Sequence, residues 1–250
     1  MNTAASSKWE LGRDQDIHVV TGATSGIGRA IAMALAEGDR KVLALGRRQA
    51  ELSTLESQCP GRLAGRAVDL LDDDAVKVVV DELLASQGRV KALIHCAGVQ
   101  ANGPLATASS AAIDLMYRTN LRAPLLLTQR LLEPLQRAGG TVVFMNSSAG
   151  ISETAGAAAP AYAALHHANR RLAEAWRQEL NPRGIRVLSL YPGRTNTPRI
   201  ERLAADEGRP WQPWLLLQPH DIAALVALAL DLPDTVELTD IKLRPAKKSY

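Results

Sequence analysis

The chain has 250 residues, of which 46% are apolar and only 4% aromatic, and its formal net charge is +3. This length fits one large α/β domain. The small charge, with no basic block interleaved with aromatic residues, does not indicate nucleic-acid binding. Two cysteines, Cys59 and Cys96, do not make a disulfide framework, so we expect a reducing compartment.

The sequence contains no targeting, membrane or metal-binding signal. Residues 1–16 are polar, lack the apolar core of a secretory signal and are expected to form a flexible leader. The longest apolar run, residues 222–230, is too short to span a membrane. No group of His, Cys, Asp and Glu has the spacing of a metal site. We therefore expect a cytoplasmic protein that uses no metal and binds neither a membrane nor nucleic acid.

Apolar runs typical of buried strands alternate with segments typical of helices. In chain order, strands are predicted at residues 17–20, 41–45, 63–68, 90–95, 141–145, 185–190 and 236–243, and helices at 29–37, 72–87, 109–118, 120–137, 161–180 and 220–230. This alternation predicts a doubly wound, Rossmann-type α/β fold, with a parallel sheet of about seven strands and helices on both faces. We expect a single domain over residues 17–250.

The first predicted strand leads into a glycine-rich turn, V-T-G-A-T-S-G-I-G at residues 20–28. Glycine permits a tight turn and the close approach of a phosphate. The helix N-terminus that follows offers free N–H groups and a dipole that favours negative charge. The turn is therefore predicted to bind the phosphates of a dinucleotide, through Gly22, Thr24, Ser25, Gly26, Ile27 and Gly28.

The end of the second strand bears on which dinucleotide binds. An NAD site usually has an acidic residue about 20 residues after the glycines, whereas an arginine there suits the 2′-phosphate of NADP. Gly46 stands where the acid would be, and Arg47 and Arg48 follow it. Because a guanidinium pairs with phosphate through two hydrogen bonds, we predict an NADP(H) cofactor.

Other polar or glycine-containing motifs also follow predicted strands. Ligands of such sheets bind beyond the carboxyl ends of the strands, so these motifs are expected to meet. Tyr162 opens the long helix, and Ser148 lies 14 residues earlier, at the end of the fifth strand. A phenol in water has a pKa near 10, so Tyr162 needs a neighbour's help to act as a general acid or base at neutral pH.

Taken together, these motifs resemble the short-chain dehydrogenase/reductase (SDR) family, classical branch, over residues 17–243. The resemblance rests on the glycine turn and on Asp69, the Cys96-Ala97-Gly98 turn, Asn120, Ser148, Tyr162 and the segment P-G-R-T-N-T at residues 192–197. It implies that Tyr162 protonates a carbonyl oxygen while the cofactor delivers hydride, that Ser148 orients this oxygen, and that Asn120 belongs to a water relay. Ser147 stays an alternative to Ser148, because the spacing from Ser148 to Tyr162 is slightly longer than the commonest one.

The resemblance also implies cofactor contacts outside the glycine turn and the arginines. They fall on Asp69, Leu70, Cys96, Ala97, Gly98, Tyr162, His166, Pro192, Gly193, Thr195 and Thr197. It further implies a homodimer or homotetramer, paired through the helices predicted at residues 120–137 and 161–180, where small residues such as Ala168, Ala173 and Ala175 allow close packing.

The chain departs from the family at one catalytic position. The family motif Y-x-x-x-K reads Tyr162-Ala163-Ala164-Leu165-His166 here, so His166 replaces the lysine that holds the nicotinamide ribose and lowers the pKa of the tyrosine. An imidazole is shorter, and with an ordinary pKa near 6.5 it is mostly neutral at pH 7.5. We expect His166 to belong to the catalytic set and to favour reduction over oxidation. Cys96, where the family usually has Asn, is a milder departure.

Residues 195–218 contain three prolines and two tryptophans and are predicted to form a partly irregular substrate lid. Trp211, Trp214 and residues 215–217 either line an apolar pocket or pack a small core of their own. The sequence thus predicts an NADP(H)-dependent oxidoreductase that acts on a small carbonyl or alcohol substrate, in the reductive direction. The alternative is a catalytically weakened relative that binds NADP(H) as a sensor or scaffold.

Overall fold

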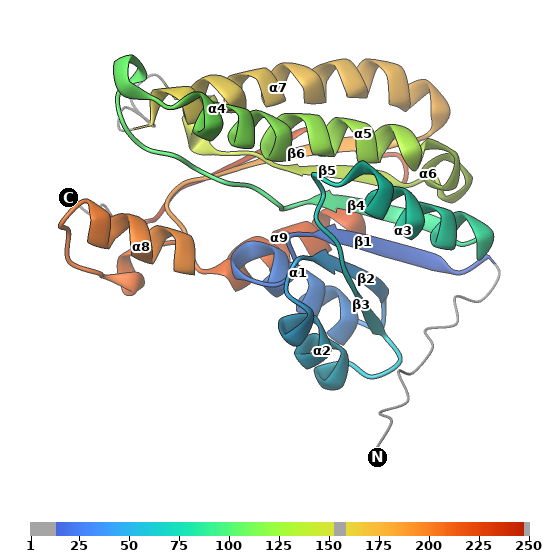
Figure 1. Cartoon of the computed structure of the whole chain (residues 1–250). Helices are drawn as coiled ribbons and strands as arrows, with labels where there is room; N and C mark the ends of the chain where they lie inside the picture. Colours follow the sequence, from blue (N-terminus) through green and yellow to red (C-terminus); the bar gives the residue numbers. More distant parts are fainter. Residues whose placement is uncertain (1–13, 153–158, 248–250) are drawn as a thin grey trace.

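The computed structural model describes residues 14–152 and 159–247. Seven parallel strands form one sheet in the order β3-β2-β1-β4-β5-β6-β7. They are β1 Asp16–Thr21, β2 Lys41–Gly46, β3 Leu63–Ala67, β4 Arg89–His95, β5 Thr141–Met145, β6 Arg186–Pro192 and β7 Asp240–Leu243. Helices lie on both faces of this sheet (Figure 1), which confirms the predicted Rossmann-type fold.

Two helical layers enclose the sheet (Figure 1). One layer holds α1 Gly26–Glu37, α2 Gln49–Gln58 and α9 Pro219–Leu230. The other holds α3 Asp73–Ala85, α4 Ser110–Tyr117, α5 Ala123–Arg130, α6 Leu132–Ala138 and α7 Pro160–Leu180. A further helix, α8 Pro198–Asp206, projects from the edge of this sandwich. No helix of the described residues is long and apolar enough to cross a membrane.

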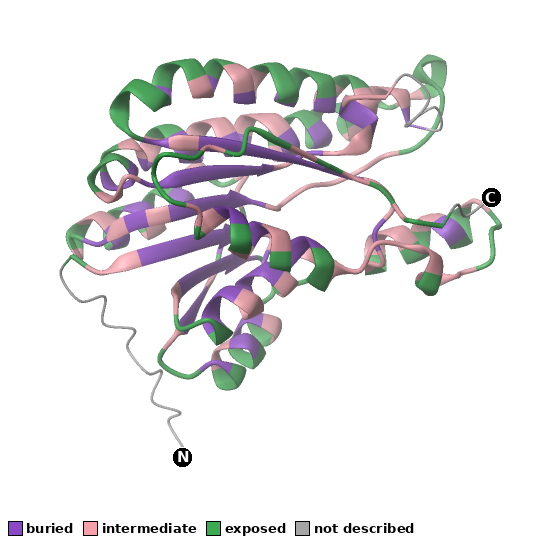
Figure 2. Ribbon diagram, turned by 180° about the vertical axis from the view of Figure 1, so that it is seen from behind, coloured by how far each residue is buried: buried purple, intermediate pink, exposed green. Residues whose placement is uncertain are grey.

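The core consists of two apolar clusters, one on each face of the sheet. Ile31, Leu35 and Val226 pack on one face, and Leu135 and Leu180 are among the residues that pack on the other. Strands β1 to β6 are buried almost throughout, the edge strand β7 is partly exposed, and the helices expose their outer surfaces (Figure 2). Parallel strands buried on both faces read as continuous apolar runs, which is why the sequence predicts six of the seven so closely.

Four local features differ from the sequence-based prediction. The last strand, predicted at residues 236–243, covers only Asp240–Leu243. Helix α2 was not predicted, because it is polar and buries only Leu52 and Leu55. The break expected near Asn120 is a π-helical turn, Arg118–Arg122 (η2), which joins α4 to α5 without interruption. The helix predicted at residues 120–137 instead divides at Leu131, between α5 and α6.

The predicted lid at residues 195–218 contains helix α8 and the short 3-10 turn Pro213–Leu215 (η5). Its two ends meet, because Asn196 N–H donates to Leu217 O at 2.8 Å and Leu217 N–H donates to Arg194 O at 3.1 Å. The segment is therefore a closed excursion from the end of β6, and it is more regular than its prolines suggest.

Buried histidines make the stability of this fold depend on pH. Burial lowers the pKa of His18 to about 4 and that of His95 and His166 to about 3. Below the pH near 6.5 at which an unfolded histidine titrates, the unfolded chain binds protons that the folded chain does not. As the pH is lowered from about 6.5 to 4, the free energy of unfolding should therefore decrease, by about 1.4 kcal/mol per pH unit for each histidine.

Urea unfolding between pH 7.5 and pH 5 tests this expectation. His95→Gln should reduce the pH dependence of the free energy of unfolding, whereas His220→Gln, at an exposed position, should leave it as in the wild type. An equal pH dependence in the His95→Gln variant and the wild type would contradict it.

Candidate active site

The glycine turn after β1 depends on contacts too close for any side chain. Gly22 has φ +65°, and a Cβ added to it would lie 2.7 Å from the backbone nitrogen of Ala97. A Cβ added to Gly28 would lie 2.5 Å from the carbonyl oxygen of Gly22. Glycine at these positions therefore lets the turn after β1, the start of α1 and the turn after β4 pack directly on one another.

The N-terminus of α1 is open for an anion. Ser25 is the N-cap residue, yet its side chain caps no backbone N–H, and the first turn of α1 contains no acidic residue. The unpaired N–H groups of a first helical turn favour a phosphate. Gly26 has φ +53°, and a Cβ there would lie 3.1 Å from Cγ2 of Thr197, so the segment after β6 closes over this turn. The residues present thus fit a dinucleotide diphosphate.

Thr21, the last residue of β1, joins the two central strands. Its hydroxyl oxygen accepts hydrogen bonds from the backbone N–H groups of Cys96 at 3.1 Å and Ala97 at 3.2 Å, and it donates to Ile94 O at 3.4 Å. Burial raises the pKa of the Cys96 thiol to about 12. Cys96 is therefore a packing residue, because only the thiolate is an effective nucleophile.

The arginines predicted to select the cofactor lie at the end of β2. Arg48 donates from Nη2 to the carbonyl oxygen of Thr24 at 2.6 Å and pairs with Glu51 at 2.8 Å. Arg47 is exposed and has no partner among the described residues. A Cβ at Gly46 would lie 2.5 Å from Cγ2 of Thr24, so an acidic residue here would displace that side chain.

The third strand brings Asp69 and Leu70 to the same edge of the sheet. Val68 N–H donates to Gly46 O at 2.8 Å, which continues the pairing of β2 with β3 to its end. Asp69 is exposed, and its Oδ1 accepts from Leu71 N–H at 3.0 Å. The Asp69 carboxylate therefore helps to shape this turn, and its predicted contact with the adenine side of a cofactor stays a prediction.

The turn after β5 differentiates the two candidate serines. Ser147 Oγ accepts from Ala149 N–H at 3.2 Å and so caps the 3-10 turn Ser148–Gly150 (η3). Ser148 is half-buried and has no side-chain partner among the described residues. A Cβ at Gly150 would lie 2.7 Å from the carbonyl oxygen of His166, so this turn packs directly on α7 and brings Ser148 to the first turns of that helix.

Tyr162 and His166 lie together on α7. Their ring centroids are 4.2 Å apart, with the rings inclined at 63°. The Tyr162 hydroxyl has no hydrogen-bond partner among the described residues, and it is not fully buried. Nδ1 of His166 lies 2.5 Å from Oδ1 of Asn146. Burial, followed by the charges of Arg199 and His167, lowers the pKa of His166 to about 3, so its ring is neutral at physiological pH.

Asn120 holds the turn after β4 in place. Its side chain accepts from Val99 N–H and donates to Val99 O, both at 2.8 Å, and its own carbonyl oxygen accepts from Asn169 Nδ2 at 2.8 Å. These contacts are those of a buried, satisfied polar residue. The water relay that the resemblance implies for Asn120 stays a prediction.

The segment after β6 reaches across to this group of residues. Pro192 ends β6, Gly193 N–H donates to Leu243 O at 2.8 Å, and Thr195 Oγ1 donates to Gly193 O at 3.0 Å. Thr197 caps α8 by accepting from Ile200 N–H at 3.4 Å. The predicted cofactor-binding segment thus lies beside the glycine turn that Thr197 covers.

Arg199, in the first turn of α8, is a residue that the sequence analysis did not assign. Its Nη2 donates to Gly98 O at 2.6 Å. It acts electrostatically on His166, and none of the described carboxylates pairs with it. A guanidinium without a counter-ion therefore lies between the lid and the residues around Tyr162.

The lid tryptophans differ from each other in burial. Trp211 is half-buried and lines, with Ile200 and Leu216 among others, a small cavity of about 40 Å³ within the lid. Trp214 is 71% exposed. The packing of Trp211 fits the small core that the sequence analysis left open as one alternative.

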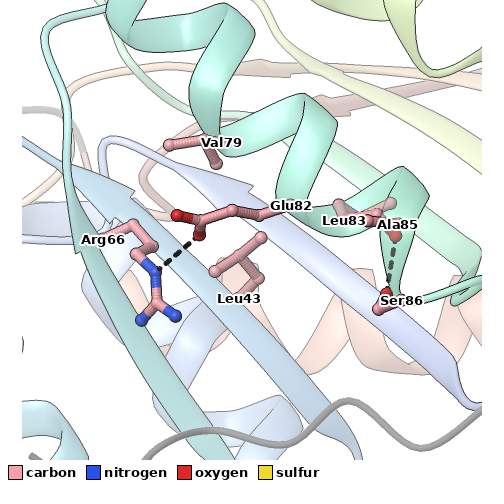
Figure 3. Close-up of a pocket in the computed structure, with 7 residues that line it drawn as sticks. All are labelled: Leu43, Arg66, Val79, Glu82, Leu83, Ala85 and Ser86. Carbon is pink, nitrogen blue, oxygen red and sulfur yellow. Dashed lines mark hydrogen bonds and ion pairs between the residues drawn. The ribbon is translucent and has the colours of Figure 1, made fainter.

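A cavity of about 350 Å³ lies elsewhere, between α3 and strands β2 and β3 (Figure 3). Leu43, Val79 and an ion pair between Arg66 and Glu82 line it. None of the predicted site residues contributes to it, so it is no candidate for the active site. The described residues contain no group of three or more His, Cys, Asp or Glu arranged to hold a metal ion.

Comparison with known proteins identifies the family. Residues 16–208 match the model of the short chain dehydrogenases. The chain belongs to this family. An uncharacterized short-chain type dehydrogenase/reductase of Sinorhizobium fredii, y4eK, is 32% identical over 235 residues, covering 92% of this chain and 91% of the relative. Sulfoacetaldehyde reductase 2 of Chromohalobacter salexigens is 29% identical over 244 residues, covering 94% and 96%.

Solved structures agree with this assignment. The closed form of a serine dehydrogenase complexed with NADP+ has a TM-score of 0.83 and 25% identity, and the match covers 94% of this chain and 96% of the other. This short-chain dehydrogenase is therefore an oxidoreductase by family.

The structure brings the predicted residues together at one edge of the sheet and adds three that the sequence analysis missed: Asn146, Arg199 and the backbone of Val99. A sequence signal existed for Asn146, because it is the first polar residue after β5. No signal existed for Arg199 and Val99, since each is placed by a long-range contact.

Proposed function

We propose that this short-chain dehydrogenase is an NADPH-dependent carbonyl reductase. The observation that carries the proposal is the Tyr162 hydroxyl, not fully buried and without a partner among the described residues, beside a neutral His166. A protonated phenol is a competent proton donor to a carbonyl oxygen. A sensor or scaffold without activity is not favoured, because neither the Tyr162 nor the Ser148 hydroxyl is hydrogen-bonded to another described residue.

The proposed chemistry divides the roles among residues of this chain. A bound NADPH supplies the hydride. The N–H groups at residues 26–28 hold its diphosphate, and Arg47 holds its 2′-phosphate. Ser148 donates a hydrogen bond to the substrate carbonyl oxygen, and Tyr162 transfers its proton to that oxygen as negative charge develops there. Ser148 is preferred to Ser147, whose oxygen already caps the following turn.

The proposed preference for reduction over oxidation rests on the charge of His166. Alcohol oxidation requires the Tyr162 phenolate, and a nearby cation would stabilise that anion. His166 supplies no positive charge at neutral pH. Reduction uses the protonated phenol and needs no such cation, so we propose that this enzyme works chiefly as a reductase.

Removing the transferable proton tests the function. Tyr162→Phe keeps the aromatic ring against His166 but loses the proton, so reduction of carbonyl substrates should fall at least about a hundredfold. NADPH binding, followed by fluorescence titration, should change little. A Tyr162→Phe variant that reduces substrates at the wild-type rate would overturn the proposed function. Tyr117→Phe, on an exposed side chain of α4, is the matched control.

Cofactor preference is tested at the end of β2. The variant Arg47→Ala/Arg48→Ala should weaken NADPH binding by about tenfold or more, because charge-assisted hydrogen bonds to the 2′-phosphate are lost. NADH binding should stay nearly unchanged. Arg62→Ala, at the opposite edge of the sheet, serves as the control for loss of a guanidinium. Equal NADPH affinity in the double variant and the wild type would refute NADP specificity.

The guanidinium of Arg199, which donates to Gly98 O but pairs with no carboxylate of the described residues, favours carbonyl substrates that carry a carboxylate, sulfonate or phosphate. Arg199 is half-buried, and a partly desolvated cation gains from an anionic partner. Two similar proteins, a sulfoacetaldehyde reductase and a serine dehydrogenase, are named for substrates with such groups.

Paired substrates, such as an oxo acid and its neutral amide, test this preference. Arg199→Met should raise KM for the anionic member by about tenfold or more and leave KM for the neutral member unchanged. Arg202→Met, exposed on the same helix, is the control. If NADPH affinity falls instead and both substrates respond alike, Arg199 serves the cofactor and the proposed substrate class is wrong.

We also propose a homodimer or homotetramer. Ala168 and Ala175 are exposed on α7, whereas Ala173 is buried in the chain's own core and cannot contact a partner. Leu115 and Tyr117 of α4 are each 44% exposed, and α4 runs beside α7 (Figure 1). Such a face suits a two-fold contact between copies.

Light scattering at micromolar concentration should therefore give at least twice the monomer mass. Ala168→Glu should lower that mass, and Ala85→Glu, at an exposed alanine of α3, should not. A monomeric wild-type protein would contradict the proposal.

A further inference from the structure

We propose that Asn146 is a positioning residue that fixes His166 in its Nδ1–H tautomer, so that Nε2 presents a hydrogen-bond acceptor at the position predicted to face the cofactor. The inference rests on the proposed function only in naming the cofactor. The tautomer itself is a property of the free protein.

The orientation of the Asn146 amide is set by the backbone. Its Oδ1 accepts from Ser147 N–H at 3.0 Å. A backbone N–H can only donate, so the amide oxygen, and not the nitrogen, must occupy this position. The choice has a cost, because Nδ2 is left buried without a partner in the described part of the chain, and a buried unpaired donor destabilises the fold.

The same oxygen determines where the proton of His166 lies. Asn146 Oδ1 is 2.5 Å from His166 Nδ1. An oxygen and a nitrogen this close must share a proton, and the amide oxygen has none to give. His166 Nδ1 therefore carries the proton and donates it to Oδ1.

Both partners are held on rigid elements. Asn146 N–H donates to Leu190 O at 2.8 Å and Phe144 O at 3.0 Å, which fixes the backbone at the ends of β5 and β6. The Gly150 backbone packs on the backbone of His166 in α7, as the steric contact of an added Cβ indicates. The hydrogen bond thus links the sheet to α7 beside Tyr162.

The remaining nitrogen of His166 is consequently a lone-pair acceptor. Among the described residues, Arg199 from α8 and His167 from α7 act on the ring electrostatically, and Tyr162 contacts it. None of these three is a carboxylate that would favour a second proton. His166 Nε2 makes no hydrogen bond with the described residues and is not fully buried. It is available to accept a hydrogen bond from a hydroxyl group.

An acceptor reverses the electrostatics that a lysine gives this position. An ammonium group carries three donors and a positive charge, which stabilise a phenolate. A neutral Nε2 offers a lone pair, which favours a protonated hydroxyl on Tyr162 or on the cofactor ribose and disfavours an anion. Asn146 and His166 act as a pair, because the Asn146 amide determines which nitrogen of the imidazole carries the proton and which one offers a lone pair.

Long-range ¹H–¹⁵N NMR of the free protein, labelled at histidine nitrogens, tests the inference without any activity measurement. The signals of His166 are assigned by their loss in His166→Gln. The wild type should show a protonated Nδ1 and an unprotonated Nε2 at pH 7. A protonated Nε2 with an unprotonated Nδ1, or both nitrogens protonated, would overturn the inference.

Two variants extend the test. In Asn146→Ala the fixed acceptor is gone, and the His166 proton should move to Nε2. In Asn146→Asp an anionic acceptor should keep Nδ1 protonated and raise the pH at which Nε2 gains a proton by about 1–3 units. Asn102→Ala, an exposed asparagine, should leave both signals as in the wild type. If Asn146→Ala does not fold, the wild-type spectrum and the Asn146→Asp titration still decide.

The pH profile of kcat/KM for alcohol oxidation connects the tautomer to catalysis. Asn146→Asp adds a negative charge beside His166, which disfavours the Tyr162 phenolate, so the midpoint of the profile should rise. His166→Lys adds a positive charge, so the midpoint should fall by about 1–3 units. Unchanged midpoints in both variants would overturn the effect of this pair on Tyr162. Failure of the tautomer prediction leaves the Tyr162→Phe result unaffected, so the two proposals fail separately.

Discussion

The close contact between the turn after β1 and the turn after β4 is the constraint on which the site depends. A Cβ at Gly22 or Gly28 would fall within 2.7 Å of neighbouring backbone, so only glycine lets α1 begin directly beside the central strands. Strands β1 and β4 are neighbours in the sheet, although β2 and β3 lie between them in the sequence. The order of strands reverses between them, which is where α/β sheets bind ligands. The same close contact between the two turns therefore positions both the predicted phosphate site and the residues after β4.

The sequence predicted the elements that bury apolar residues and the motifs at strand ends. Six of the seven strands lie within two residues of their predicted bounds, because a strand buried on both faces is a continuous apolar run. Helix α2 escaped prediction because only Leu52 and Leu55 of its ten residues are buried. The π-helical turn at Asn120 escaped for another reason. Asn120 within it is hydrogen-bonded to Val99 and Asn169, which are distant in sequence, and such contacts leave no local pattern.

The site illustrates the same limit at the scale of single residues. Sequence spacing identified Tyr162 and His166 as neighbours on one helix face, and the 4.2 Å between their rings confirms it. Spacing could not say that Asn146 reaches His166, because β5 and α7 are brought together by the packing of Gly150 on the helix backbone. It also could not place Arg199, whose guanidinium meets Gly98 only through the closed course of the lid.

Because His166 is buried, its imidazole is neutral at physiological pH, unlike the lysine of the family motif. A lysine at this position would have to keep an ammonium group next to Arg199, and like charges in a poorly solvated setting raise the free energy of both. A neutral imidazole avoids that repulsion. The imidazole also donates a hydrogen bond to Asn146 Oδ1. An aliphatic residue at position 166 could not make this bond. Arg199, His166 and Asn146 are therefore mutually consistent: a cation on the lid side is compatible with an uncharged acceptor on α7, and the amide at the end of β5 holds that acceptor in one tautomer.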